Sequence, residues 1–218
     1  KIYVVGGSSA SFDATTYQQY ASVFAYDIAT NRWAEVAPLP RPYAVMAVVA
    51  AAGKVYAFGG LDENSMASAQ SYEYDPARNV WTAKTPMPGG PRYLAAAAAL
   101  NGEIYVVGGW DERAVVEIYD PATDRWRAGP PLQQVRHSLG LTAGPDGYLY
   151  AVGGAISSSG EGSVERYTPT TGAWETLSAL NDQARLGTAA VYAAGQLYAV
   201  GGANVGQSVE GLRIDTSF

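Results

Sequence analysis

The chain has 218 residues, with 20 Asp and Glu against 14 Lys and Arg, one His and no Cys. The net charge of −6 argues against binding to a nucleic-acid phosphate backbone, which needs a basic face. The absence of Cys excludes disulfides and Cys-ligated metals, and the lone His137 excludes any site that needs two imidazoles. An apolar content of 48% is too high for a disordered chain, while the longest apolar run, residues 43–52, is too short to span a membrane.

From the N-terminus onward, the sequence repeats a short apolar run that ends in two glycines. The doublets are Gly6-Gly7, Gly59-Gly60, Gly108-Gly109, Gly153-Gly154 and Gly201-Gly202, preceded by IYVV, VYAF, IYVV, LYAV and LYAV. After each of the first four doublets comes a Tyr, followed seven residues later by a Trp. These pairs are Tyr26 and Trp33, Tyr74 and Trp81, Tyr119 and Trp126, and Tyr167 and Trp174. The recurrence predicts a structural unit of about 47 residues.

Each unit is predicted to hold four short antiparallel strands. The first strand is small and apolar, at Tyr43–Ala52, Tyr93–Leu100, Ser138–Ala143 and Gly187–Ala194. A tight turn such as Asn101-Gly102 joins it to the second strand, which ends in the glycine doublet. A variable loop leads to the strand with the Tyr, and a turn beginning Asp-Pro leads to the strand with the Trp. The segment Leu94–Leu100 has the composition of a helix, but its place in the repeat predicts a strand.

A glycine doublet after an apolar strand, followed by Tyr and Trp seven residues apart in units of about 47, resembles the kelch repeat. The resemblance covers essentially the whole chain and implies an all-β fold, a kelch-type β-propeller of four-stranded blades. It also implies that the recurring Gly, Tyr and Trp residues are structural, because blades must pack face to face to bury their apolar surfaces. A phosphate-binding role for the doublets is disfavoured, since no Gly-Lys-Ser/Thr sequence follows them.

The repeat divides one predicted propeller domain, 1–218, into units at 1–42, 43–91, 92–135, 136–183 and 184–218. The first unit lacks its first strand, and the last unit lacks its fourth and has Leu212 where the Tyr is expected. This count leaves about four and a half blades of a five- or six-bladed ring. We therefore expect either that the sequence is part of a longer chain or that a partner chain supplies the missing strands.

Function in this architecture is expected on the rim loops and at the channel mouth. The segment before each first strand contains an arginine, and Pro42 and Tyr43 make Arg41 the poorest match among the four. By resemblance to kelch adaptors that pair with BTB domains, these arginines form a positive ring for acidic peptides. Alternatively, each arginine bonds loop carbonyls of the neighbouring blade. The candidate rim residues are Arg41, Arg92, Arg136, Arg185, Trp110, Tyr43, Tyr93 and His137.

The loops between the second and third strands differ in length and sequence, which is typical of a specificity surface. They are Ser8–Ser22 with Phe12, Asp13, Tyr17 and Tyr20, Leu61–Ala69, Trp110–Arg113 and Ser157–Gly162. Trp110 lies outside the Tyr–Trp register, so it is predicted either to anchor a ligand or to pack on the adjacent blade. Asp62, Glu63 and Asn64 have the oxygen chemistry of calcium ligands, but without a loop pattern they are predicted to be solvated charge.

Enzyme functions are poorly supported by the residues. Kelch copper-radical oxidases need a Cys and two His ligands, and the iron motif of kelch specifier proteins would place Gly129 and Gln133 where acids are required before His137. A mutarotase-like sugar enzyme needs only a few acid–base groups, such as His137, Arg136 and Glu112. We predict a non-enzymatic binding module without cofactor or metal, whose partner is a protein segment, acidic peptides included, or a glycan. The sugar enzyme and a structural domain of a larger exported protein are the alternatives.

The composition also bears on the source of the chain. It is rich in Ala, has eleven Arg against three Lys and lacks Cys, which is typical of a GC-rich bacterium. By resemblance to bacterial kelch proteins, we expect an extracytoplasmic location.

Overall fold

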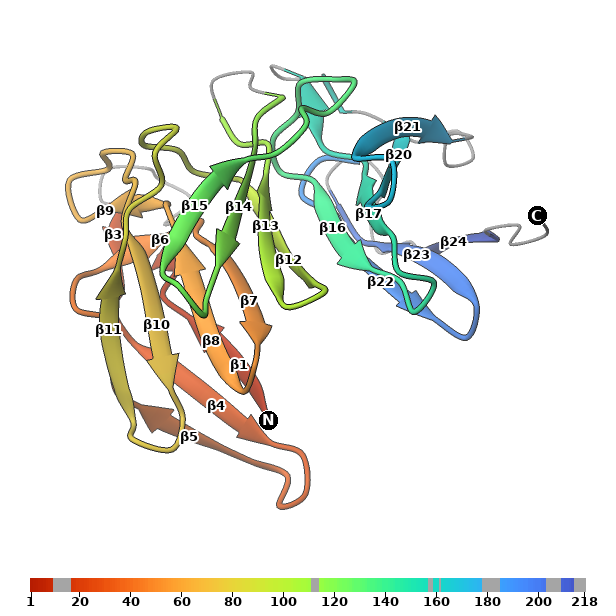
Figure 1. The fold of residues 1–218 in the computed structure, drawn as a ribbon. Helices are drawn as coiled ribbons and strands as arrows, with labels where there is room; N and C mark the ends of the chain where they lie inside the picture. Colours follow the sequence, from red (N-terminus) through yellow and green to blue (C-terminus); the bar gives the residue numbers. More distant parts are fainter. Residues whose placement is uncertain are drawn as a thin grey trace. The chain divides into compact units, whose positions relative to one another are not determined.

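The computed structural model describes residues 1–9, 17–110, 114–156, 159–160, 162–177, 185–202 and 209–213. The regular structure of these residues is β-strand, paired antiparallel throughout (Figure 1). None of them forms a helix long and apolar enough to cross a membrane. The chain forms two compact units, Lys1–Tyr93 and Leu94–Phe218, which are described separately below.

The unit Lys1–Tyr93 contains two sheets whose strands lie in chain order. The first sheet consists of β1 (Ile2–Val5), β4 (Val23–Asp27) and β5 (Arg32–Val36). The second consists of β7 (Ala47–Ala51), β8 (Lys54–Phe58), β10 (Ser71–Asp75) and β11 (Val80–Lys84). Two short pairs belong to the loops, β2 (Ser8–Ser9) with β3 (Gln18–Gln19) and β6 (Tyr43–Ala44) with β9 (Leu61–Asp62).

The unit Leu94–Phe218 contains three sheets of the same design. The third sheet is β12 (Ala96–Leu100), β13 (Glu103–Val107), β14 (Val116–Asp120) and β15 (Arg125–Ala128). The fourth is β16 (Gly140–Ala143), β17 (Leu149–Val152), β20 (Val164–Thr168) and β21 (Ala173–Leu177), with the short pair β18 (Ala155–Ile156) and β19 (Ser159–Gly160) beside it. The fifth is β22 (Ala189–Ala193), β23 (Gln196–Val200) and β24 (Val209–Arg213).

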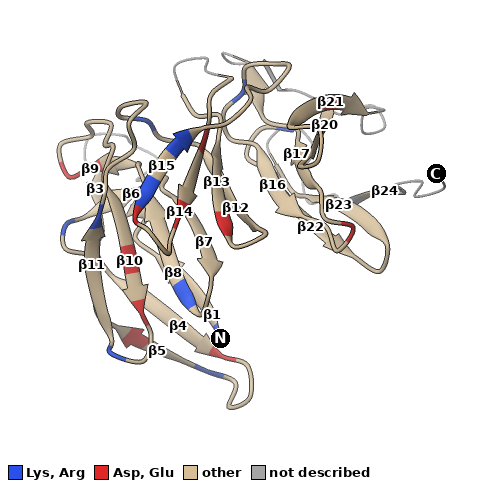
Figure 2. Cartoon of the chain, viewed as in Figure 1, with Lys and Arg blue, Asp and Glu red and all other residues tan. Residues whose placement is uncertain are grey.

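The alanine-rich segment confirms the prediction made from its place in the repeat. Ala96–Leu100 forms β12, paired with β13 in register from Ala96–Val107 to Leu100–Glu103. Like β12, the strands β7, β16 and β22 contain no charged residue (Figure 2). In the unit Leu94–Phe218, β16 lies beside both β12 and β22, so small uncharged side chains allow first strands to approach closely.

The Tyr–Trp pairs stand directly opposite each other on neighbouring strands. In the second and fourth sheets, Tyr74 faces Trp81 and Tyr167 faces Trp174, with ring centroids 5.2 and 5.3 Å apart. The indole N–H of Trp174 donates a hydrogen bond of 3.1 Å to the carbonyl of Pro130, just after the third sheet. Trp81 donates in the same way to Ala37, just after the first sheet. Each of these two tryptophans therefore ties its sheet to the chain that leaves the preceding one.

In four of the repeats, a residue in the left-handed conformation precedes the first strand, which is β7, β12, β16 or β22. These residues are Val45 (φ 51°), Leu94 (φ 56°), Ser138 (φ 53°) and Gly187 (φ 71°). In the unit Leu94–Phe218 their backbones are linked, because Ser138 N–H donates to the carbonyl of Leu94 and Gly187 N–H donates to that of Ser138. Left-handed backbone strains any residue except glycine, and most of all a β-branched one such as Val45.

Candidate functional site

The repeat places four residues at one equivalent backbone position, which we call the rim position. Its carbonyl accepts a hydrogen bond from the second glycine of the doublet before it, at 2.7 to 3.0 Å in the four cases. The occupants are Tyr43, Arg92, Arg136 and Arg185. Arg41 therefore does not belong with the other three arginines, as its poor match in sequence suggested, and Tyr43 takes the rim position in the second sheet.

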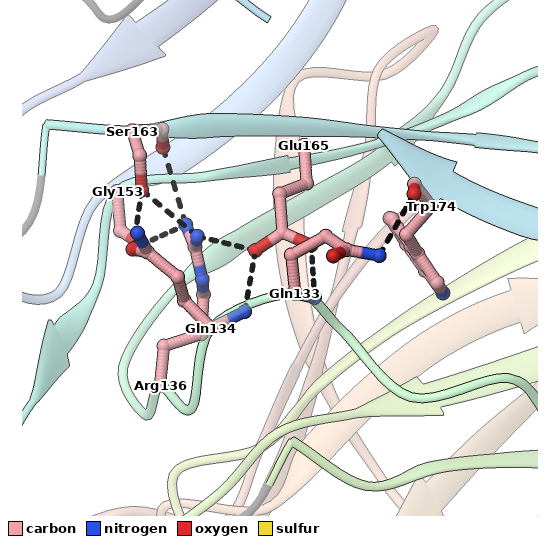
Figure 3. A network of polar contacts seen from close by, with 7 residues as sticks. All are labelled: Gln133, Gln134, Arg136, Gly153, Ser163, Glu165 and Trp174. Atoms are coloured by element: carbon pink, nitrogen blue, oxygen red, sulfur yellow. Dashed lines mark hydrogen bonds and ion pairs between the residues drawn. The ribbon is translucent and has the colours of Figure 1, made fainter. Parts of the chain in front are cut away.

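Arg136 is buried in a polar network where the central strands β17 and β20 of the fourth sheet end and begin (Figure 3). Its guanidinium donates to the carbonyls of Gly153 and Ser163 at 3.0 and 3.1 Å and to the Ser163 hydroxyl at 2.8 Å. It also pairs with the Glu165 carboxylate at 2.6 Å, and both side chains are 0% exposed. Of the two predicted roles, this geometry favours the structural one for Arg136.

Glu165 joins this network to the loop 129–136, which we call the glutamine loop. One carboxylate oxygen accepts from the backbone N–H of Gln133 at 2.7 Å, and the other accepts from that of Gln134 at 3.2 Å (Figure 3). The Gln133 amide group donates to the carbonyl of Trp174 at 3.0 Å, although the residue as a whole is exposed. The sequence analysis did not single out Glu165. Its signal was a carboxylate inside the apolar strand motif Val-Glu-x-Tyr.

The other two rim arginines are also buried, each with 2% of its surface exposed. Arg185 donates to the carbonyl of Gly201 at 3.0 Å, which is again a contact with a loop carbonyl. Tyr93, which follows Arg92, is half-buried. The predicted ring of arginines facing a ligand is thus less well supported than the structural alternative at Arg92, Arg136 and Arg185.

The second sheet fills the same buried position with different chemistry. Tyr72 stands two residues before Tyr74, as Glu165 stands two residues before Tyr167. Its hydroxyl lies 3.3 Å from that of Tyr43, and the two rings are 5.8 Å apart. Burial and the Tyr43 hydroxyl raise the pKa of Tyr72, so Tyr72 is uncharged at neutral pH. Two tyrosines therefore replace the buried Arg–Glu pair.

Arg41 lies on the surface of the unit Lys1–Tyr93, in an ion pair with the loop Leu61–Ala69. Its guanidinium is 2.6 Å from Glu63 and 3.7 Å from Asp62. The Glu63 carboxylate raises the pKa of Arg41, and Arg41 lowers that of Glu63. Asp62 also accepts from the backbone N–H groups of Asn64 and Met66, so it caps a turn. In the described part of the chain, no three acidic or His residues gather as metal ligands.

Trp110 and His137 come together in the unit Leu94–Phe218. Their ring centroids are 4.5 Å apart, and Trp110 remains 43% exposed while His137 is buried. The His137 Nδ1 lies 3.0 Å from the Ser138 hydroxyl, and its backbone pairs with Ala155 through two hydrogen bonds. Trp110 therefore packs on His137, while its role as a ligand anchor stays a prediction.

Several predicted loop residues lie outside the described part of the chain. They are Phe12, Asp13, Asp111, Glu112, Arg113, Ser157, Ser158 and Glu161, together with residues 178–184. Among the described loop residues, Tyr17 is 60% and Tyr20 39% exposed, and between them Gln19 donates to the Ser65 hydroxyl at 3.1 Å. This hydrogen bond holds two loops of the unit Lys1–Tyr93 together.

Comparison with known proteins identifies the family. Residues 1–202 match the model of the KLHDC2/KLHL20/DRC7 Kelch-repeats domain. Kelch repeat and BTB domain-containing protein 12 of Danio rerio is 36% identical over 116 residues, which cover 50% of this chain and 18% of that protein. The N-acetylneuraminate epimerase of Pasteurella multocida (strain Pm70) is 39% identical over 85 residues, 36% of this chain and 22% of the epimerase.

Comparison with a solved structure, that of YjhT, concerns the fold alone. It superposes with a TM-score of 0.82 over 99% of this chain and 79% of its own, at 16% sequence identity. The predicted all-β kelch propeller fold is confirmed. The matched segment is less than a fifth of the length of the Danio rerio protein, so that protein's other domains have no counterpart in the match. From its repeat pattern, its sheets and the family model, the chain belongs to the kelch-repeat family.

Proposed function

We propose that this chain is a non-enzymatic binding module that holds a protein segment against Trp110 and the glutamine loop. Kelch-repeat proteins generally mediate protein interactions, which supports the choice of partner. Trp110 is adjacent to the glutamine loop because it packs on His137, the residue that follows the loop. The surface therefore combines one exposed aromatic ring with two exposed glutamine residues, Gln133 and Gln134.

The observation that carries the proposal is the setting of Trp110. The Tyr–Trp register of the repeat does not require this residue, yet its ring is held against a buried imidazole while 43% of its surface stays exposed. An aromatic ring fixed in this way loses little conformational entropy on binding and buries a large area, as interface anchors do. The variable loops around an otherwise regular repeat fit the same role.

A displayed library of random peptides, selected against the whole chain, tests this function. Binding of the selected peptides is then measured for the wild type, Trp110→Ala and Trp33→Ala. Trp33 is the matched control, since it is 56% exposed but belongs to the first sheet. We expect Trp110→Ala to weaken binding by about tenfold or more and Trp33→Ala to leave it unchanged. Equal binding by Trp110→Ala and the wild type contradicts the proposal.

A sugar-directed activity is the second candidate, favoured by the similarity to the Pasteurella multocida epimerase over 85 residues. The acid–base group that the sequence offers for it is His137, which is buried beside Trp110 and whose Nδ1 lies 3.0 Å from the Ser138 hydroxyl. NMR of N-acetylneuraminate anomers tests this activity directly. Faster interconversion with the wild type than with His137→Gln supports it, and equal rates with and without the protein reject it.

A further inference from the structure

We infer that Glu165 is the positioning residue of the glutamine loop, so that binding at the rim depends on a carboxylate that no partner can touch. The inference deepens the proposed function and rests on it only where it concerns binding. Glu165 is 0% exposed and lies on β20, a strand inside the fourth sheet. Any effect of Glu165 on a partner must therefore pass through the residues that it holds.

The contacts of Glu165 divide between the core and the loop. Arg136 supplies one charged donor at 2.6 Å, and the loop supplies two backbone donors, from Gln133 at 2.7 Å and from Gln134 at 3.2 Å (Figure 3). Hydrogen bonds to an ionised acceptor are stronger than those between neutral groups. One buried carboxylate thus fixes two consecutive peptide groups and the guanidinium at the end of the same loop.

Elsewhere the glutamine loop is anchored by backbone hydrogen bonds and by side-chain contacts of Gln133, Gln134 and Trp174. Leu132 N–H donates to the carbonyl of Ala114 at 2.9 Å, and the carbonyl of Arg136 accepts from Gly109 N–H at 3.0 Å. Between these two anchors, the backbone N–H groups of Gln133 and Gln134 both point to Glu165 (Figure 3). Gln133 and Gln134 are the exposed glutamines of the proposed surface. Glu165 therefore holds the backbone of this surface in place through two hydrogen bonds.

The unit Lys1–Tyr93 provides an internal comparison. Its corresponding segment, residues 37–42, has Pro40 three residues before Tyr43, where the glutamine loop has Gln133 three residues before Arg136. A proline has no N–H group to donate. In that unit the place of Glu165 is taken by Tyr72, whose hydroxyl is 3.3 Å from that of Tyr43. Between these two sheets, the carboxylate is present where the loop donates two N–H groups and absent where a proline removes one.

This comparison also supplies a variant that separates the loop function from a general role in the core. The double substitution Arg136→Tyr with Glu165→Tyr transfers the tyrosine pair of the second sheet into the fourth. It removes both buried charges together, so neither is left without its partner. If the carboxylate serves only to balance Arg136, the double variant should keep the loop in place.

The experiment measures backbone amide exchange by NMR on the whole chain, without any ligand, in the wild type and the double variant. We expect the amides of Gln133 and Gln134 to exchange about ten- to a hundredfold faster in the variant. The amide of Leu132, bonded to Ala114, and that of Leu39, bonded to Ala21, should keep their rates and serve as controls. Unchanged exchange at Gln133 and Gln134 overturns the inference.

A second variant keeps the test decisive where the double variant fails to fold. Glu165→Gln retains the shape of the side chain but not its charge, and here too unchanged exchange at both glutamine amides overturns the inference. A peptide selected for the rim should bind the loosened variant about tenfold more weakly. A failure to find any peptide rejects the proposed function but leaves the exchange result standing, so the two failures are distinguishable.

Discussion

The hydroxyl of Tyr43 lies 3.3 Å from that of Tyr72, in the place where the fourth sheet has Arg136 within 2.6 Å of Glu165. One repeat position thus holds an uncharged pair in one sheet and a buried ion pair in another. Arg41, two residues before Tyr43, lies on the surface and pairs with Glu63. Arg136 and Arg41 occupy similar places in the sequence, but one belongs to a buried ion pair and the other to an exposed one.

Replacing each of these arginines with alanine should give very different results. Arg136→Ala leaves the Glu165 carboxylate buried without its cation, which typically costs about 3–5 kcal/mol of unfolding free energy. Arg41→Ala removes only an exposed pair and should leave the stability essentially unchanged. Urea denaturation of the two variants measures the difference, and a similar loss in both would refute the assignment.

Stability should also respond to the left-handed residues before the first strands. Val45 has a φ of 51° and is 41% exposed. The substitution Val45→Gly therefore relieves backbone strain and removes only a small buried apolar area. We expect a gain of about 0.5–1 kcal/mol, the left-handed cost of valine less the entropy cost of glycine. The reverse change, Gly187→Val, has open space around the new Cβ and should lose about 0.5–1 kcal/mol by the same difference. Thermal denaturation checks both signs, and a stabilising Gly187→Val contradicts the argument.

The first glycine of the doublet Gly108-Gly109 should tolerate no side chain. A Cβ on Gly108 would overlap the carbonyl oxygen of Arg136, whereas a Cβ on Gly102 would meet nothing within 4 Å. Both residues have positive φ, so the pair separates steric overlap from backbone strain. We expect Gly102→Ala to cost about 1–2 kcal/mol and Gly108→Ala to cost several kcal/mol more. Equal losses, measured by denaturant titration, would show that the overlap is relieved at no cost.

The alkaline limit of stability should depend on Tyr105. Burial, with a smaller contribution from Tyr167, raises the pKa of Tyr105 to about 12 in the folded chain. Because an unfolded tyrosine titrates near pH 10, this contribution is fully present below about pH 10 and is lost as the pH rises through about 12. Unfolding free energies measured across this range should fall less steeply for Tyr105→Phe than for the wild type. Parallel curves would assign the alkaline transition to other groups.

Much of the fold could be predicted because the repeat fixes register more firmly than local propensity does. Ala96–Leu100 consists of good helix formers, yet it forms β12 because its neighbours β13 and β16 impose a pleated strand. The left-handed conformation at Leu94 was not predicted, since nothing in a leucine indicates it.

The candidate site was predictable in part. Trp110 was found because it falls outside the Tyr–Trp register, and its contact with His137 required the structure. The place of Arg41 was missed by two positions, because Pro42 and Tyr43 separate it from the strand. Tyr43 stands as far before the doublet Gly59-Gly60 as Arg92 stands before Gly108-Gly109, so this spacing identifies Tyr43 as the occupant of the rim position. Glu165 stayed hidden because its partners, two backbone amides and Arg136, are 29 to 32 residues away in sequence.

The chain-order topology of the sheets bears on how the protein folds. In the described residues, each sheet of three or four strands is built from one continuous stretch of chain with its strands in chain order, so it can form before distant segments have to meet. Pairing within one stretch of chain limits the loop-closure entropy that must be overcome before each sheet forms. During synthesis, a four-stranded sheet can therefore assemble soon after its Trp strand emerges and act as a template for the next, which makes folding a vectorial process along the chain.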